Sequence, residues 1–258
     1  MSSDWDPARY LSFAEERSRP LSELLARVVT TQARLVVDLG CGPGTSTMPL
    51  LERWPAARVV GVDSSPAMIA RATGAARGPR VSFVKADIGD WEPEEAPDVV
   101  VANAVLQWVP EHVSVIERFA SVLAPGGSLA IQVPGNFGEP SHALMRELAA
   151  SGRWPVPPGL LRESPVLDPG GYLSVLAGLG LDADVWSTTY LHVLDGPDPV
   201  LEWVRGTALR PVLAALGDEA PSFEAAYAAA LREAYPPDAA GRTVLAFRRI
   251  FAVGRRPG

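Results

Sequence analysis

The residues best suited to chemistry form a glycine-rich turn with an acidic residue just before it. Leu35–Gly44 reads LVVDLGCGPG, in which Asp38 precedes Gly40, Gly42 and Gly44. The apolar start predicts a strand and the residues after the turn predict a helix, a layout that brings backbone N–H groups to a ligand. Glycine suits such a turn because it adopts positive φ and lets the backbone approach a ligand closely.

A second acidic residue lies where a carboxylate usually holds a ribose. Arg58–Val62 predicts a second strand, which delivers Asp63 and then Ser64 about 20 residues beyond the turn. The glycine spacing is G-x-G-x-G rather than the G-x-G-x-x-G of a dinucleotide site, which argues against a dehydrogenase. These features predict a nucleotide-like cofactor, and a purely structural strand-to-helix turn is the alternative.

The chain also resembles a known family. DLGCGPGTST, GVDSSPAM and the ADI at 86–88 are similar to class I S-adenosylmethionine-dependent methyltransferases. Blocks from Trp5 to Arg256 resemble the trans-aconitate 2-methyltransferases more specifically, among them WDPARYLSFAEERSRP, NAVLQWVPEH and LAFRRIFAVGRR. The glycine turn is shared by many methyltransferases, so the N-terminal and C-terminal blocks are the specific part of this resemblance.

The resemblance implies a fold and an activity. The fold is α/β, Rossmann-like, with a seven-stranded, mostly parallel sheet whose last strand is antiparallel, helices on both faces and helical cap elements. The cofactor is S-adenosyl-L-methionine, and the reaction methylates a carboxylate of trans-aconitate to give the monomethyl ester and S-adenosylhomocysteine. A methyltransferase for another small carboxylic acid, or a non-catalytic protein that binds S-adenosylmethionine, are the alternatives.

The 258 residues are expected to form a single methyltransferase domain with three elaborations. The resemblance implies that residues 1–20 close over the active site as a lid, and an amphipathic helix packed on the main domain is the alternative. Residues 134–170 and 195–242 are expected to be cap insertions that shape a substrate pocket. Residues 21–32 are predicted to continue as a helix toward the first strand. Further strands are predicted at 81–84, 98–102, 128–133, 184–193 and 244–253, and helices at 113–123, about 169–179, 198–215 and 221–235.

Polar residues after the third strand suit an adenine ring. The carboxylate of Asp87 could accept from an exocyclic amine, and the backbone N–H of Ile88 could serve a ring nitrogen. The alternative for Asp87 is a helix or turn cap.

The predicted fourth strand is fully apolar, as expected at the centre of a parallel sheet. Two candidate cofactor-binding residues follow it. Asn103 lies at its C-terminal edge, where open α/β sheets bind ligands. Trp108 could form a wall of the cofactor site or plug the core. His112 is left without an assigned role.

A small polycarboxylate substrate needs a local concentration of positive charge, because the protein carries a formal net charge of −7. Arginine suits carboxylates through its planar fork. The candidate substrate ligands in the family-matched blocks are Tyr10, Arg17, Arg19, His142, Arg146, Tyr172, Tyr190, Arg210 and Arg248. Family members tend to carry Pro-Arg where this chain has Arg248 and Arg249, so the counterpart could be Arg249. At least two arginines are expected to reach the substrate.

No catalytic acid, base or metal is predicted, since a carboxylate is already ionised at neutral pH and methyl transfer to it needs only positioning. The 23 basic residues show no dense run, which disfavours a nucleic-acid partner. Cys41 is the only cysteine and is expected to be small and buried rather than reactive. No signal peptide or membrane span is visible, so a cytoplasmic protein is expected.

Overall fold

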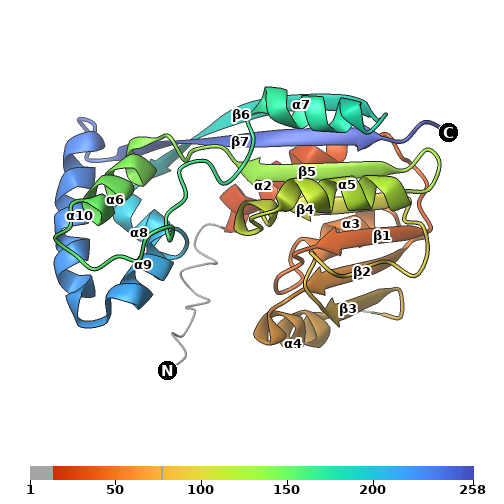
Figure 1. Ribbon diagram of the computed structural model, residues 1–258, viewed down its shortest axis with the longest axis horizontal. Coiled ribbons are helices and arrows are strands. Elements are labelled where there is room, and N and C mark those ends of the chain that lie inside the picture. The colour runs from red at the N-terminus through yellow and green to blue at the C-terminus, as the bar shows by residue number, and fades with distance from the viewer. Residues whose placement is uncertain (1–13, 77) are drawn as a thin grey trace. The chain divides into compact units, whose positions relative to one another are not determined.

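The computed structural model describes residues 14–76 and 78–258, which divide into two compact units (Figure 1). The sheet unit comprises Arg17–Pro134, Val166–Thr188 and Arg249–Gly258. The helical unit contains Gly135–Pro165 and Thr189–Arg248. The two expected cap insertions therefore fall largely in a unit of their own.

The sheet has seven strands in the order β3-β2-β1-β4-β5-β7-β6. The strands are β1 Leu35–Leu39, β2 Arg58–Asp63, β3 Val81–Lys85, β4 Val99–Asn103, β5 Ser128–Pro134, β6 Asp182–Leu194 and β7 Thr243–Arg255. The pairs β1–β2, β1–β4, β2–β3 and β4–β5 are parallel, and β7 runs antiparallel to β5. The predicted fold class is thus confirmed. The strand order reverses between β1 and β4, and open α/β sheets bind ligands at such a switch point.

The helices of the sheet unit are α2 Ala14–Ala26, α3 Thr47–Arg53, α4 Pro66–Ala75, the 3-10 turn η1 Leu106–Trp108, α5 His112–Val122 and α7 Pro169–Gly178. The prediction of a helix over residues 21–32 is wrong at its end, because α2 stops at Ala26. Val28, Val29, Thr30 and Thr31 follow, and β-branched side chains lose χ1 freedom in a helix.

The core of the sheet unit explains why its central strands are mostly apolar. All five residues of β1 are buried, and β4 is buried except for its last residue. Phe119 on α5 and Leu176 on α7 are fully buried in the same cluster as these strands. Full burial of each such side chain contributes roughly 1.5–3 kcal/mol. The switch point between β1 and β4 therefore rests on a rigid, packed base.

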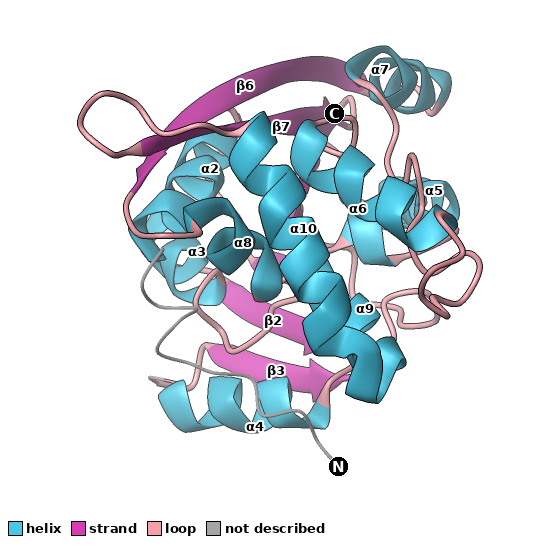
Figure 2. Cartoon of the chain, turned by 90° about the vertical axis from the view of Figure 1, so that its left-hand side faces the viewer, coloured by secondary structure: helices cyan, strands magenta, loops and turns pink. Residues whose placement is uncertain are grey.

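The helical unit is built around α10 Ala220–Ala234, which packs against α6 Pro140–Ala150, α8 Pro199–Arg205 and α9 Leu209–Leu216 (Figure 2). Its core includes Trp154, Trp203 and Phe223. The predicted helix over 198–215 is two helices, because α8 ends at Arg205 and is followed by Gly206, a residue of low helix propensity. Helix α6 was not predicted, although Pro140 at its start is a helix-initiation signal.

Within residues 14–76 and 78–258, no helix is long and apolar enough to cross a membrane. In the same residues, no group of three or more His, Cys, Asp or Glu side chains could hold a metal ion.

Candidate active site

The glycine turn is tied to the end of β2 by its own backbone. The N–H groups of Gly40 and Cys41 both donate to the Val62 carbonyl, at 2.8 and 3.1 Å. A Cβ on Gly40 would lie 2.3 Å from Val105, so this position is closed to any side chain. Gly42 has φ +54° and no atom within 4 Å of the place where a Cβ would stand. The turn is therefore packed at Gly40 and open at Gly42.

Asp38 is buried beneath this turn and is 1% exposed. Its carboxylate accepts hydrogen bonds from the hydroxyls of Ser46, at 2.9 Å, and Thr47, at 2.7 Å. Burial raises the pKa of Asp38 to about 6, and the charge of Asp63 adds to this, against the lowering effect of the two hydroxyls. Through these contacts Asp38 holds the start of α3 against the end of β1.

Cys41 is also buried at this turn. Burial, with smaller effects of Asp38 and Asp63, raises the pKa of its thiol. The thiol therefore stays protonated at neutral pH, which suits a packing role.

Asp63 ends β2 and faces the glycine turn. One carboxylate oxygen accepts from the Gly42 N–H at 3.0 Å, and the other accepts from the Ser65 N–H at 2.8 Å. Each carboxylate oxygen has a further lone pair, so the group can still accept from a ligand's hydroxyls. Ser64 is exposed beside it, and Ser65 caps α4 by accepting from the Met68 N–H.

Asp87 and Ile88 follow β3. One oxygen of Asp87 accepts from the Gly89 N–H at 2.8 Å, which is the turn-cap role. Its carboxylate is exposed, so a second oxygen remains for a ligand. The Ile88 side chain is buried, and within the described part of the chain its N–H has no acceptor. Both roles considered for Asp87 are therefore compatible with this geometry.

Asn103 lies at the end of β4, with its Oδ1 buried and without a hydrogen-bond partner among the residues described. Ala104, the next residue, adopts φ +56°, which is rare for a residue with a Cβ. Its N–H donates to the Gln132 carbonyl at 2.8 Å. Strained backbone of this kind gathers at functional sites. Trp108 is 59% exposed, which rules out the core-plug alternative.

Gln132 on β5 was missed in the sequence analysis, and Arg249 on β7 was named there only as the alternative to Arg248. Gln132 is 1% exposed and Arg249 is 8% exposed. The Nη1 of Arg249 donates to Oε1 of Gln132 at 3.3 Å. A polar Gln inside the otherwise apolar strand SLAIQVP was the signal that could have found the first of them.

Tyr172 lies in the core of the sheet unit rather than at an open surface. Its side chain is 0% exposed, and its ring lies 6.0 Å from that of the buried His112. Burial raises the pKa of the Tyr172 hydroxyl. This placement favours a packing role for Tyr172.

His142 and Arg146 lie together on α6 of the helical unit, four residues apart. The His142 ring is 3.2 Å from the Ser141 hydroxyl through Nδ1 and makes an edge contact with Phe137. Burial, followed by the charge of Arg146, lowers the pKa of His142 to about 4. Arg146 donates to the Phe137 carbonyl at 2.8 Å. The pair thus presents a neutral imidazole beside a guanidinium.

The remaining candidates are scattered. Tyr190 on β6 is 4% exposed and stacks against His192. Arg210 on α9 is exposed, Arg248 on β7 is half-buried, and Arg19 on α2 is exposed. Tyr10 and the side chain of Arg17 lie outside the described residues.

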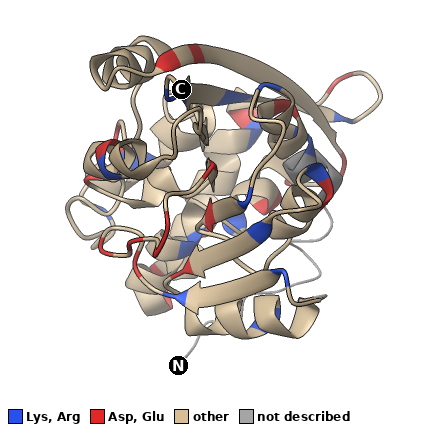
Figure 3. Ribbon diagram, turned by 90° about the vertical axis from the view of Figure 1, so that its right-hand side faces the viewer, with Lys and Arg blue, Asp and Glu red and all other residues tan. Residues whose placement is uncertain are grey.

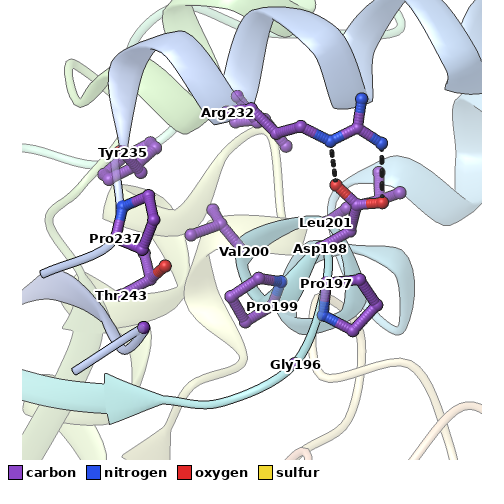
Figure 4. A pocket seen from close by; sticks show the side chains of 12 residues that line it. Gly196, Pro197, Asp198, Pro199, Val200, Leu201, Arg232, Tyr235, Pro237 and Thr243 are labelled. Atoms are coloured by element: carbon purple, nitrogen blue, oxygen red, sulfur yellow. Dashed lines mark hydrogen bonds and ion pairs between the residues drawn. The ribbon is translucent and has the colours of Figure 1, made fainter. Parts of the chain in front are cut away.

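A separate pocket of about 270 Å³ lies in the helical unit (Figure 4). It is lined mostly by apolar residues, among them Pro199, Val200 and Tyr235. Its two charged side chains pair with each other, Arg232 donating to Asp198 at 2.7 and 2.8 Å. None of the predicted site residues lines this pocket.

Acidic and basic residues are mixed over the face of the sheet unit that Figure 3 turns to the viewer.

The arrangement of the sheet unit is that of a known class. A methyltransferase-domain family matches residues 36–127, which span β1 to the start of β5. Among solved structures, the phosphoethanolamine N-methyltransferase 2 of Haemonchus contortus, in complex with S-adenosyl-L-methionine, aligns with a TM-score of 0.58 at 18% identity. That alignment covers 93% of this chain and 53% of the other. The fold is that of a class I methyltransferase.

Curated relatives define the family more narrowly. A Streptomyces avermitilis protein named trans-aconitate 2-methyltransferase is 51% identical, over 98% of this chain and 97% of its own length. An Escherichia coli protein of the same name is 46% identical, over 98% of this chain and 99% of its own length. The chain belongs to the trans-aconitate 2-methyltransferase family.

Proposed function

We propose that this protein transfers a methyl group from S-adenosyl-L-methionine to a carboxylate of trans-aconitate, giving the monomethyl ester and S-adenosylhomocysteine. The observation that carries the proposal is the match of nearly the whole chain, helical unit included, to relatives of that name at 46% and 51% identity. A likeness confined to the glycine turn and its sheet would support only the cofactor, because many functions share one fold.

The residues of the sheet unit fit S-adenosyl-L-methionine. The open space at Gly42 lets a ligand approach the turn, and Asp63 has lone pairs left for two ribose hydroxyls. The free Ile88 N–H and the exposed Asp87 suit an adenine edge. The unpartnered Oδ1 of Asn103 is an acceptor that an ammonium group would satisfy. When bound, the cofactor supplies an electrophilic methyl group on a sulfonium.

The task of the chain's own residues is to bind, orient and desolvate, because no proton has to move. A substrate carboxylate has a free pKa near ~4 and is ionised at neutral pH. His142 is neutral there, since its pKa is lowered to about 4. It can therefore donate a hydrogen bond to a carboxylate without acting as a base. In-line placement of the carboxylate at ~3–3.5 Å from the reacting carbon would supply the rate.

Positive side chains are proposed to hold the substrate's carboxylates. The candidates are Arg17, Arg19, Arg146, Arg210 and Arg248, with Tyr10 and His142 as hydrogen-bond donors. Among them Arg146 and His142 have the best support, since they lie together on α6 and Arg146 forms no ion pair with a carboxylate in the described part of the chain. Tyr172 and Tyr190 have weaker support because both are buried in packing clusters.

The test is a mass-spectrometric assay with S-adenosylmethionine and trans-aconitate, cis-aconitate, isocitrate, citrate and a monocarboxylate. Formation of a monomethyl ester selectively from trans-aconitate, in step with S-adenosylhomocysteine, is the expected result. Selective ester formation from another acid would overturn the substrate and keep the reaction. Cofactor binding with no ester from any acid would overturn the reaction itself.

A further inference from the structure

Three polar side chains, two of them buried and one partly buried, lie on one face of the sheet near the C-terminal ends of β4 and β5. Asn103 is paired with Gln132 across β4 and β5, and Pro134 is paired with Arg249 across β5 and β7. Directly paired residues share a face, as do residues two apart on one strand. The side chains of Asn103, Gln132 and Arg249 therefore share a face at the ligand-binding edge of the sheet.

The contact between Arg249 and Gln132 fixes the orientation of the glutamine amide. A guanidinium only donates, so the amide atom that it meets at 3.3 Å must be Oε1. The amide nitrogen is then turned away, where it is buried without an acceptor in the described part of the chain. Leaving such a buried donor unmet is costly, and native proteins rarely do so without a reason.

The chemistry of the missing acceptor follows from its surroundings. The Gln132 amide offers N–H donors, and the adjacent Arg249 side chain is a permanent cation. A carboxylate suits the Gln132 donor, because it accepts hydrogen bonds and its negative charge is favoured beside a guanidinium.

Aromatic side chains and a helix cover part of this face, which strengthens such a contact. Phe251 is paired with Gln132 and stacks at 4.9 Å on Trp186. Glu23 of α2 accepts hydrogen bonds from Trp186 and from Thr188. Helix α2 thus packs over the same face, and hydrogen bonds to charge are stronger where water is excluded.

We propose that Gln132 and Arg249 bind a carboxylate group of the methyl acceptor. Gln132 donates through its amide nitrogen, and Arg249 both supplies positive charge and holds the amide in that orientation. This inference rests on the proposed function, since it takes the acceptor to be a polycarboxylic acid. The methionine carboxylate of the cofactor has the same chemistry and is the alternative source.

The test compares wild type with Gln132→Glu and Gln132→Met. The Gln132→Glu side chain keeps its shape, can pair with Arg249 and repels a carboxylate, whereas Gln132→Met only removes the donor. Gln32→Glu, the same chemical change at an exposed position, is the matched control. Calorimetry measures binding of S-adenosylhomocysteine alone, and then of trans-aconitate to the S-adenosylhomocysteine complex. Steady-state kinetics give KM and kcat.

Weaker binding of trans-aconitate by at least about tenfold in Gln132→Glu, with a smaller loss in Gln132→Met, is expected from loss of a charge-assisted hydrogen bond. KM should rise with it, and S-adenosylhomocysteine affinity should stay within about twofold of wild type. A loss confined to S-adenosylhomocysteine binding would assign the site to the cofactor and overturn the inference. Unchanged binding of both ligands in folded Gln132→Met would overturn it as well.

If the proposed function were wrong, the same experiments would give a different set of results. Wild type that binds trans-aconitate but forms no ester would refute the activity, while the variants would still decide whether Gln132 binds the acid. Wild type that binds none of the acids would overturn both proposals.

Discussion

The Asp63 carboxylate accepts a hydrogen bond from the Gly42 N–H at 3.0 Å, which joins the end of β2 to the open point of the glycine turn. This contact gives one residue two tasks. Asp63 fixes the path of the turn, and it keeps lone pairs directed at the place where a ligand would approach Gly42.

Asp63→Ala is expected to weaken S-adenosylhomocysteine binding at least about tenfold, because a charge-assisted acceptor is lost and the Gly42 N–H loses its partner. Isothermal calorimetry measures this directly. Asp63→Asn is the matched control, since it keeps the shape and one acceptor oxygen and should lose less. An affinity unchanged in both variants would show that the ribose contact is placed elsewhere.

Gly40→Ala should mainly lower the stability of the fold, whereas Gly42→Ala should mainly lower the affinity for the cofactor. At Gly40 the new Cβ would lie 2.3 Å from Val105, so the free energy of unfolding should fall by about 1–3 kcal/mol from overpacking. At Gly42 the Cβ meets no atom, so only the positive φ costs stability, about 1 kcal/mol. Gly42→Ala should nevertheless lose cofactor affinity, because the Cβ occupies the open space of the turn.

Thermal unfolding and calorimetry on both variants separate the two effects. Gly40→Ala combined with Val105→Ala should recover part of the lost stability, since the clash is with that side chain. Full cofactor affinity in Gly42→Ala would mean that no ligand approaches the turn there.

The sequence predicts most of the sheet unit because its signals are local. A glycine turn after an apolar strand, and Asp63 at the end of the next, specify β1 and β2 within a short stretch. The contact between Gln132 and Arg249 depends on strand order and register, which bring these residues together although they lie 117 positions apart. Such a cluster cannot be read from local spacing.

The candidate substrate ligands also show how little local sequence patterns say about which side chains meet. Tyr172 was named as a hydrogen-bond donor for the substrate because its side chain is polar, yet α7 packs it into the core. His142 and Arg146 do come together, because a spacing of four residues puts both on one face of α6. The helix was missed in the sequence, so this neighbourhood could not be predicted.

Arg146→Met is expected to raise KM for trans-aconitate about tenfold or more while leaving S-adenosylhomocysteine binding unchanged, because it removes a cation beside His142. Steady-state kinetics with calorimetry test this. Arg153→Met, at an exposed arginine of the same unit, is the control for loss of one positive charge. Equal KM values for the two variants would remove Arg146 from the substrate ligands.

The buried carboxylate of Asp38 should make stability depend on pH in an unusual direction. Its pKa is raised from 3.8 to about 6 in the folded protein, so between these values the folded state binds more protons than the unfolded chain. The stabilisation from its protonation is complete below about pH 4 and is lost as pH rises through about 6. The difference corresponds to about 3 kcal/mol in the free energy of unfolding.

His142 acts in the opposite direction over an overlapping range, because its pKa is lowered from 6.5 to about 4. The unfolded chain then binds the extra proton, and stability falls as the pH drops through this window. The dependence of wild-type stability on pH therefore contains the contributions of both Asp38 and His142.

Urea unfolding of wild type, Asp38→Asn and His142→Gln at pH 4.5, 5.5, 6.5 and 7.5 separates the two contributions. The stability of wild type relative to Asp38→Asn should increase toward low pH, because protonated Asp38 no longer carries the buried charge. A relative stability constant over the four pH values would show that the Asp38 pKa is not raised.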